Sequence, residues 1–183
     1  MIKYFLPLSL ALFTLFGSVN CSYAQTKEER DFLKSLQNEK EINVILDMSR
    51  ASIHGYSESD FVYREDLQSD KDWATLWETE YKPDLLNKFL GSLNLLLFDF
   101  GYTVKFGDFE NTKYQLRLIV SEIYEKGDTF IDISIEDREK LELIFLFKID
   151  GRGGTFGSKV NLMGDGFTRA GRVAARKFHN FFK

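Results

Sequence analysis

Residues 114–149 read YQLRLIVSEIYEKGDTFIDISIEDREKLELIFLFKI, and this stretch decides the fold. Apolar side chains recur at every second position in three runs, a period typical of strands that bury one face. The alternating positions are Tyr114, Leu116, Leu118 and Val120, then Ile131, Ile133 and Ile135, then Leu141, Leu143, Phe145, Phe147 and Ile149. Just upstream, Tyr102, Val104 and Phe106 show the same alternation. The pattern therefore predicts four strands.

The links between these strands are short and polar, at residues 107–112, 125–128 and 137–140. Antiparallel neighbours can be joined by such links, whereas a parallel crossover needs about a dozen residues or more. We therefore expect a four-strand antiparallel meander.

The elements on either side complete the predicted fold. Apolar residues alternate over 42–48, which predicts a strand, and residues 60–66 indicate a second strand or an extended connection. A helical pattern begins at Ser69, and a last helix follows a glycine-rich connection over 151–166. The order of strand, helix, four-strand meander and C-terminal helix predicts an α+β fold with a mostly antiparallel sheet and helices packed on one face.

Pro83 lies inside the long helical pattern, where the apolar stripe changes direction. Trp73, Leu76, Trp77 and Tyr81 share one side, while Leu85 and the leucines that follow lie on nearly the opposite side. One straight helix cannot bury both stripes in a single core, and proline suits the first turn of a helix. A break or sharp kink is therefore predicted at Pro83.

Residues 1–24 are typical of an export signal. A basic start at Lys3 precedes a short apolar stretch, and Ser22-Tyr23-Ala24 supplies a small-x-small ending, so cleavage is predicted after Ala24. Cys21 leaves open the alternative of a lipoprotein cut before that cysteine. The predicted organisation is a signal peptide over 1–24, an N-terminal helical segment over 25–40 and a single α+β domain over 41–183. We expect a location in the periplasm or cell envelope of a Gram-negative bacterium.

The composition excludes several classes of protein. The 183 residues include one cysteine, two histidines and two prolines, with 44% apolar and 15% aromatic residues, so a disordered chain or a disulfide scaffold is excluded. With 24 basic and 28 acidic residues, the chain lacks the basic surplus of a nucleic-acid-binding protein. Nucleic acid is therefore not expected as a partner.

The order of elements resembles that of small α/β domains in bacterial cell-envelope proteins, namely the N-terminal domain of TolB and the CsgG-type curli secretion lipoprotein. The resemblance rests on the exported start, the strand over 42–48, the long helix, the meander and the last helix with Ala170-Gly171-Arg172-Val173-Ala174-Ala175. The run over 149–157 also resembles uncharacterised exported proteins of Bacteroides-type bacteria. The resemblance implies an envelope protein that works by contact with other proteins, and it transfers no catalytic residue.

A glycine-rich run offers a candidate ligand site. Arg152, Gly153, Gly154 and Lys159 resemble part of a phosphate-binding loop, in which free backbone amides and basic side chains hold an anion. The order of residues departs from that motif, because a glycine-lysine-serine ending is missing. The alternative, a strand-to-helix link that uses glycine for tight turns, is favoured.

Catalytic and metal chemistry have few candidates. His54 is flanked by serines and acids and is the candidate base of a hydrolase, although no nucleophile elbow is present. A histidine in a loop is the favoured interpretation. No metal-ligand spacing is found, so neither a metal nor a cofactor is expected.

Two groups of residues are candidates for binding a partner. Arg169, Arg172 and Arg176 recur at helical spacing away from the apolar face of the last helix, where an acidic partner or lipid headgroups can bind, although a solvated face is the commoner outcome. Trp73, Trp77 and Tyr81 form either part of the core or a contact surface.

These observations rank three functions. We expect first a non-enzymatic cell-envelope module for protein interaction or assembly, with peripheral attachment to a membrane left open. A module that binds a small molecule or a glycan is the alternative, and a hydrolase that uses His54 is the second alternative. The sequence identifies neither the partner nor the oligomeric state.

Overall fold

A computed structural model describes residues 27–183, apart from the side chains of residues 145 and 146. The predicted export segment over 1–24 lies outside the described residues. The helices are α1 (Lys27–Ser35), α2 (Glu58–Gln68), α3 (Trp73–Leu76), α4 (Lys82–Asp99) and α5 (Lys159–Phe182), with a 3₁₀ turn, η1 (Leu36–Asn38), and a π-helical turn, η2 (Trp77–Tyr81). The strands are β1 (Glu41–Asp47), β2 (Ser52–Ile53), β3 (Tyr56–Ser57), β4 (Lys105–Gly107), β5 (Tyr114–Ile123), β6 (Thr129–Asp137) and β7 (Glu142–Gly151).

Within these residues, seven strands form one mixed sheet whose central strand is β5. β5, β6 and β7 pair antiparallel along most of their length, whereas β1 and then β2 pair parallel with the other edge of β5. The predicted apolar positions of β5 and β6 are buried, because alternate side chains point into one core. The expected α+β fold with a mostly antiparallel sheet is confirmed.

The predicted four-strand meander is wrong in one strand. β4 does not pair with β5; it pairs parallel with β1 on the far side, so β1 lies between them. The short link from β4 to β5 can cross β1 because β4 ends beside Asn43 and β5 begins to pair with β1 at the same residue. Buried Asn43 of β1 holds this link in place, since its Oδ1 accepts from Phe109 N at 3.1 Å and its Nδ2 donates to Gln115 Oε1 at 3.0 Å.

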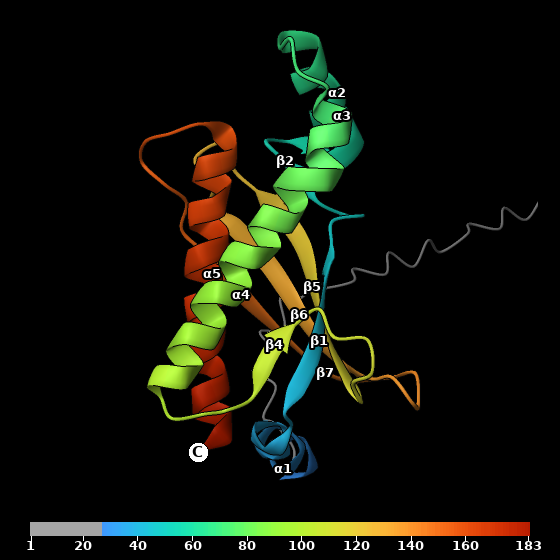
Figure 1. Cartoon of the computed structure of the whole chain (residues 1–183), viewed down its shortest axis with the longest axis vertical. Coiled ribbons are helices and arrows are strands. Elements are labelled where there is room, and N and C mark those ends of the chain that lie inside the picture. Colours follow the sequence, from blue (N-terminus) through green and yellow to red (C-terminus); the bar gives the residue numbers. More distant parts are fainter. Residues whose placement is uncertain (1–26) are drawn as a thin grey trace, which may run out of the picture.

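α4 and α5 cross over one face of the sheet (Figure 1). Phe178 of α5 contacts Phe106 of β4 and Phe147 of β7, with ring centroids 5.1 and 5.6 Å apart, so this helix spans several strands. The expectation that helices cover one face is therefore confirmed for these two helices. α1 and the C-terminus lie at one end of the molecule, and α2 and α3 lie at the opposite end.

The segment over 60–66 is helical, so the predicted strand or extended connection is wrong. Ser57 caps α2 by accepting a hydrogen bond from Asp60 N at 3.2 Å. A serine at this position, followed by an acid three residues later, stabilises a helix start.

The helix is continuous through Pro83, so the predicted break does not occur. α3, η2 and α4 follow one another without interruption, and Lys82 N–H donates to Trp77 O in the wider π-helical turn. Such a turn inserts one extra residue into the helix, which rotates the apolar stripe before α4 begins. Pro83 is the second residue of α4, which directly follows this wider turn.

The last helix begins earlier than predicted. α5 starts at Lys159, and Ser158 caps it by accepting from Asn161 N at 3.3 Å. The glycine-rich connection is thus only residues 152–158, and Gly164 and Gly166 belong to the helix. The predicted apolar face is confirmed at Phe167, Ala170, Gly171, Ala174 and Phe178, which are all buried.

Candidate functional site

The end of the molecule that carries α2 and α3 is organised around a small aromatic cluster. We call residues 52–81 the head. The ring of Phe61 contacts the rings of Trp77 at 5.6 Å and Trp73 at 6.1 Å, and Trp73 contacts Tyr81 at 5.0 Å. Trp77 is 1% exposed, and its indole N–H donates to Glu58 Oε1 at 2.7 Å. Trp73 and Trp77 therefore form the interior of the head, and Tyr81 is only partly exposed.

One cleft of about 540 Å³ opens between the head and the start of α5. We call it the aromatic cleft. Its lining includes the rings of Trp73 and Tyr81, three acids and two bases, namely Glu65, Glu80, Asp84, Lys71 and Lys159. Its volume lies within the range of small-ligand sites, and aromatic walls with a few charged groups are common there.

A second cleft of about 450 Å³ contains His54, and we call it the histidine cleft. Its lining includes Tyr56, Arg64 and Glu125, and it shares Glu65 and Lys159 with the aromatic cleft. Lys159 Nζ forms an ion pair with Glu65 Oε1, which links α5 to α2 between the two clefts.

His54 is held in an unusual backbone conformation, with φ of 53°, in the turn between β2 and β3. Its Nε2 is buried and has no hydrogen-bond partner among the described residues. Burial lowers the pKa of His54, and the nearby Lys159 lowers it further. No serine lines the histidine cleft, so the serine–histidine–acid arrangement of the hydrolase hypothesis is not assembled around this side chain in residues 27–183.

The residues predicted to hold an anion are engaged with other groups. Gly153 N–H donates to the carboxylate of Asp128 at 2.7 Å, and Lys159 pairs with Glu65. Arg169 Nη1 donates to the carbonyls of Arg152 at 3.0 Å and Gly153 at 2.7 Å. A bound anion would have to displace carboxylates from the same donors, so this arrangement favours the alternative, a tight strand-to-helix link. Gly154 is buried in that link, close to Asp165.

The three arginines of α5 are exposed, as the spacing predicted. Arg169 is tied to the preceding loop by its hydrogen bonds, whereas no hydrogen bond or ion pair involves Arg172 or Arg176 among the described residues. These two guanidinium groups are therefore available to a partner.

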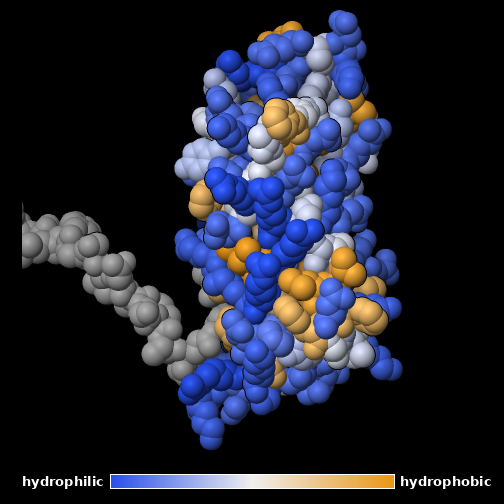
Figure 2. Space-filling view, turned by 90° about the vertical axis from the view of Figure 1, so that its left-hand side faces the viewer, coloured by the Kyte–Doolittle hydropathy of each residue, from blue (hydrophilic) through white to orange (hydrophobic). Residues whose placement is uncertain are grey.

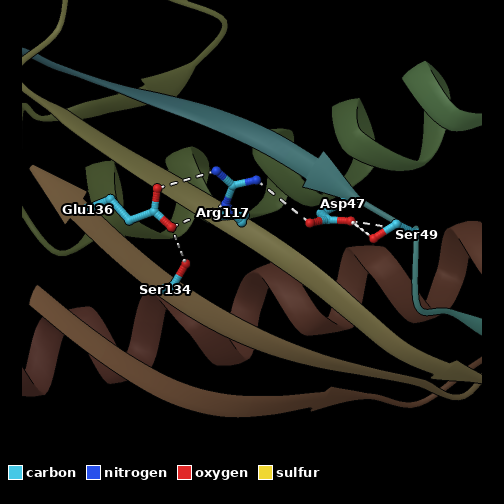
Figure 3. A network of polar contacts seen from close by, with 5 residues as sticks. All are labelled: Asp47, Ser49, Arg117, Ser134 and Glu136. Carbon is cyan, nitrogen blue, oxygen red and sulfur yellow. Dashed lines mark hydrogen bonds and ion pairs between the residues drawn. The ribbon is translucent and has the colours of Figure 1, made fainter. Parts of the chain in front are cut away.

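The face of the sheet opposite α4 and α5 carries a polar network (Figure 3). Arg117 of β5 donates from Nε and Nη2 to the two carboxylate oxygens of Glu136 on β6, at 3.2 and 3.3 Å. Its Nη1 lies 3.7 Å from Asp47 Oδ2 on β1. Ser49 donates to Asp47, which lowers the pKa of that carboxyl. The network connects three strands and places one guanidinium between two carboxylates, so we interpret it as a structural feature.

Sequence reasoning missed the exposed apolar residues of the helices. Tyr63 and Leu67 of α2 are 63% and 68% exposed, and Leu95 and Phe98 of α4 are 64% and 73% exposed. Because residues 60–66 are predicted to be extended, the four-residue spacing of Tyr63 and Leu67 does not indicate an exposed helix face. The serine at position 57, with an acid three residues later, is the signal that indicates the helix and hence their common face.

Residues 27–183 contain no group of three or more histidine, cysteine or acidic residues placed to hold a metal ion. None of the helices in this part of the chain is both long and apolar enough to cross a membrane.

No protein-family model matches the chain, and no curated relative matches it. Among solved structures, it is similar to the PelC dodecamer from Paraburkholderia phytofirmans, over 73% of this chain and 86% of that chain. The identity is 8% and the TM-score is 0.36. Likeness at this level does not demonstrate a common fold.

Proposed function

We propose that the protein is an exported, non-enzymatic module of the cell envelope that docks a protein partner on the outer surface of α2. The observation that carries this proposal is the exposure of Tyr63 and Leu67, four residues apart on one face of that helix. Tyrosine is enriched at protein interfaces because it offers a large apolar ring and a polar tip.

The surface around these residues is shaped for contact. An apolar groove of about 410 Å³ is lined by Val62, Tyr63, Ala74 and Trp77, among others. Beneath it, the buried rings of Phe61 and Trp77 hold α2 against η2. A rigid helix that presents exposed side chains beside a groove loses little conformational entropy on binding.

The charge of the head indicates what kind of partner fits. The head, residues 52–81, contains eight acidic and two basic side chains, a net charge of −6. Opposite charge across an interface steers encounter and selects partners. The partner we propose is therefore a basic protein surface that carries apolar side chains for the groove.

Capture from the native envelope fraction tests the proposal, with the tagged processed protein as bait and quantitative mass spectrometry as readout. We expect a partner that is recovered by the wild type and lost with Tyr63→Ser/Leu67→Ser. The matched control is Leu141→Ser/Leu143→Ser, which changes two exposed residues at the β6–β7 hairpin instead. Equal recovery by all three proteins would count against docking on α2.

A second candidate function is the binding of a small molecule or glycan in the aromatic cleft. It is favoured by the pair of rings, Trp73 and Tyr81, beside the carboxylates of Glu65, Glu80 and Asp84. Titration with envelope oligosaccharides, followed by tryptophan fluorescence, tests it: saturable quenching that is lost in Tyr81→Ala supports the second function, and no change in fluorescence removes it.

A further inference from the structure

The molecule presents a second exposed apolar surface, far from the head. Leu95 and Phe98 project from the C-terminal part of α4, at the end of the molecule where α1 begins and α5 ends. Figure 2 shows a group of hydrophobic side chains at this end, next to a hydrophilic stripe that runs down the molecule. Large apolar side chains that protrude together mark interaction sites.

The stripe belongs to α5, which packs directly beside α4. Ser92 Oγ donates to Thr168 O at 2.7 Å, and further along, the ring centroids of Phe100 and His179 are 4.1 Å apart. The two helices therefore run side by side in the same direction. Leu95 is one turn below Ser92, and Arg172 is one turn below Thr168. The exposed arginines of α5 therefore lie at the same height as the exposed apolar residues of α4.

The basic character of this surface contrasts with the rest of the chain. α5 has five basic residues and one acid, Asp165, although the whole protein has a net charge of −4. Asp99 is the acid at the end of α4. The acidic head is at the opposite end, so the molecule has a charge asymmetry along its length.

We propose that the surface formed by Leu95, Phe98, Arg172 and Arg176 binds peripherally to an anionic lipid bilayer. Protruding apolar side chains beside unpaired arginines fit a membrane interface, where the apolar groups enter the acyl boundary and the cations contact headgroups. In this orientation the acidic head points away from the negatively charged membrane, and Tyr63 and Leu67 remain accessible.

The charge arrangement supports this orientation by ordinary electrostatics. Anionic headgroups attract the two free guanidinium groups of α5 and repel the −6 head, and both effects turn the same end of the molecule towards the bilayer. The attraction is confined to about a Debye length, roughly 10 Å, so added salt weakens it.

Co-sedimentation with lipid vesicles tests the inference. The chain is exported with Cys21→Ser, so that no lipid can be attached at that position before processing, and the processed product is purified. It is mixed with vesicles of phosphatidylethanolamine and phosphatidylglycerol, or with neutral vesicles of phosphatidylethanolamine and phosphatidylcholine. We expect binding to the anionic vesicles, weakened about tenfold or more by Arg172→Gln/Arg176→Gln and by Leu95→Ser/Phe98→Ser.

Three control variants and a test of folding separate this result from misfolding and from an effect of the head. Arg152→Gln and Leu141→Ser change an exposed cation and an exposed apolar residue elsewhere, and Tyr63→Ser/Leu67→Ser changes the head; all three should bind vesicles like the wild type. Circular dichroism and thermal unfolding verify that each variant is folded. The inference would be overturned if the wild type did not bind anionic vesicles, or if the folded arginine and Leu95/Phe98 variants bound them as well as the wild type does. Either result would leave the proposed docking on α2 intact.

Discussion

Gly151, the last residue of β7, packs directly against the backbone of Gly166 in α5: a Cβ on Gly151 would lie 2.0 Å from the carbonyl oxygen of Gly166. Gly166 is in turn as close to Gly127, since its own Cβ would lie 2.0 Å from Gly127 O. Gly151 and Gly166, the two ends of the predicted glycine-rich connection, thus let the helix lie directly on the sheet.

Gly151→Ala should destabilise the protein by about 3 kcal/mol, because neither backbone can yield without shifting α5. Gly91→Ala is the matched control. An added Cβ there meets nothing within 4 Å, so alanine should stabilise α4 by about 0.5–1 kcal/mol. Urea unfolding of both variants measures the difference. Equal stability of the two variants would contradict the proposed close packing.

Trp77→Phe should destabilise the protein by about 1–3 kcal/mol more than Trp73→Phe. Both changes shrink a ring of the same cluster, but only Trp77 donates its indole N–H to a carboxylate, that of Glu58. Trp73 has no such hydrogen bond within the described residues. Urea unfolding of the two variants measures the effect. Similar losses would mean that this hydrogen bond contributes little.

His54 should make stability fall as the solution becomes acidic. Its folded-state pKa is lowered, so below an unfolded pKa of about 6.5 the unfolded chain takes up a proton that the folded protein resists. The stability contributed by the neutral ring is complete above that value and is lost as pH falls towards the folded pKa. Asparagine tolerates the φ of 53° at this position, so His54→Asn keeps the turn. The variant should lose less of its free energy of unfolding than the wild type when the pH is lowered from about 7.5 to about 5.5. Urea unfolding at both pH values measures it, and parallel declines in the two proteins would assign the effect to other groups.

Arg117→Met should destabilise the protein by about 1–2 kcal/mol, because it leaves Glu136 and Asp47 without their shared cation. Lys148→Met is the control, since Lys148 pairs with Asp132 from a side chain that is 80% exposed, and it should cost about 0.5 kcal/mol or less. Thermal unfolding at low and high salt measures both, and salt should reduce the effect of each change. An equal cost for the two variants would show that the Arg117 network adds nothing beyond a surface ion pair.

The strands that alternate strictly could be predicted from the sequence, but the place of β4 could not. Alternation identifies Phe106 as facing the core, yet it does not reveal which neighbour a three-residue strand takes. The answer depends on Asn43, whose side chain holds the link across β1. A buried asparagine in an apolar strand is a polar group that needs partners, but only the fold shows which partners it has.

The long helix shows a different limit. The sequence shows plainly that the apolar stripe of the helix changes direction near Pro83. A break in the helix or a wider turn can each produce such a change. The structure uses the wider turn, at Trp77–Tyr81, so the helix stays continuous and Trp77 reaches the interior of the head. For the candidate site, periodicity shows that Trp73, Trp77 and Tyr81 share one side of a helix, but it does not show whether that side packs in the core or forms a contact surface.

Site-specific photo-crosslinking tests the central claim, docking on α2, most directly. A photoreactive residue is placed at position 63 in cells that produce the native protein, and at position 141 as an equally accessible control. We predict a discrete crosslinked protein at position 63 that is absent at position 141 and that is lost when Leu67→Ser is added. No crosslink at position 63, or the same products at both positions, would contradict the account.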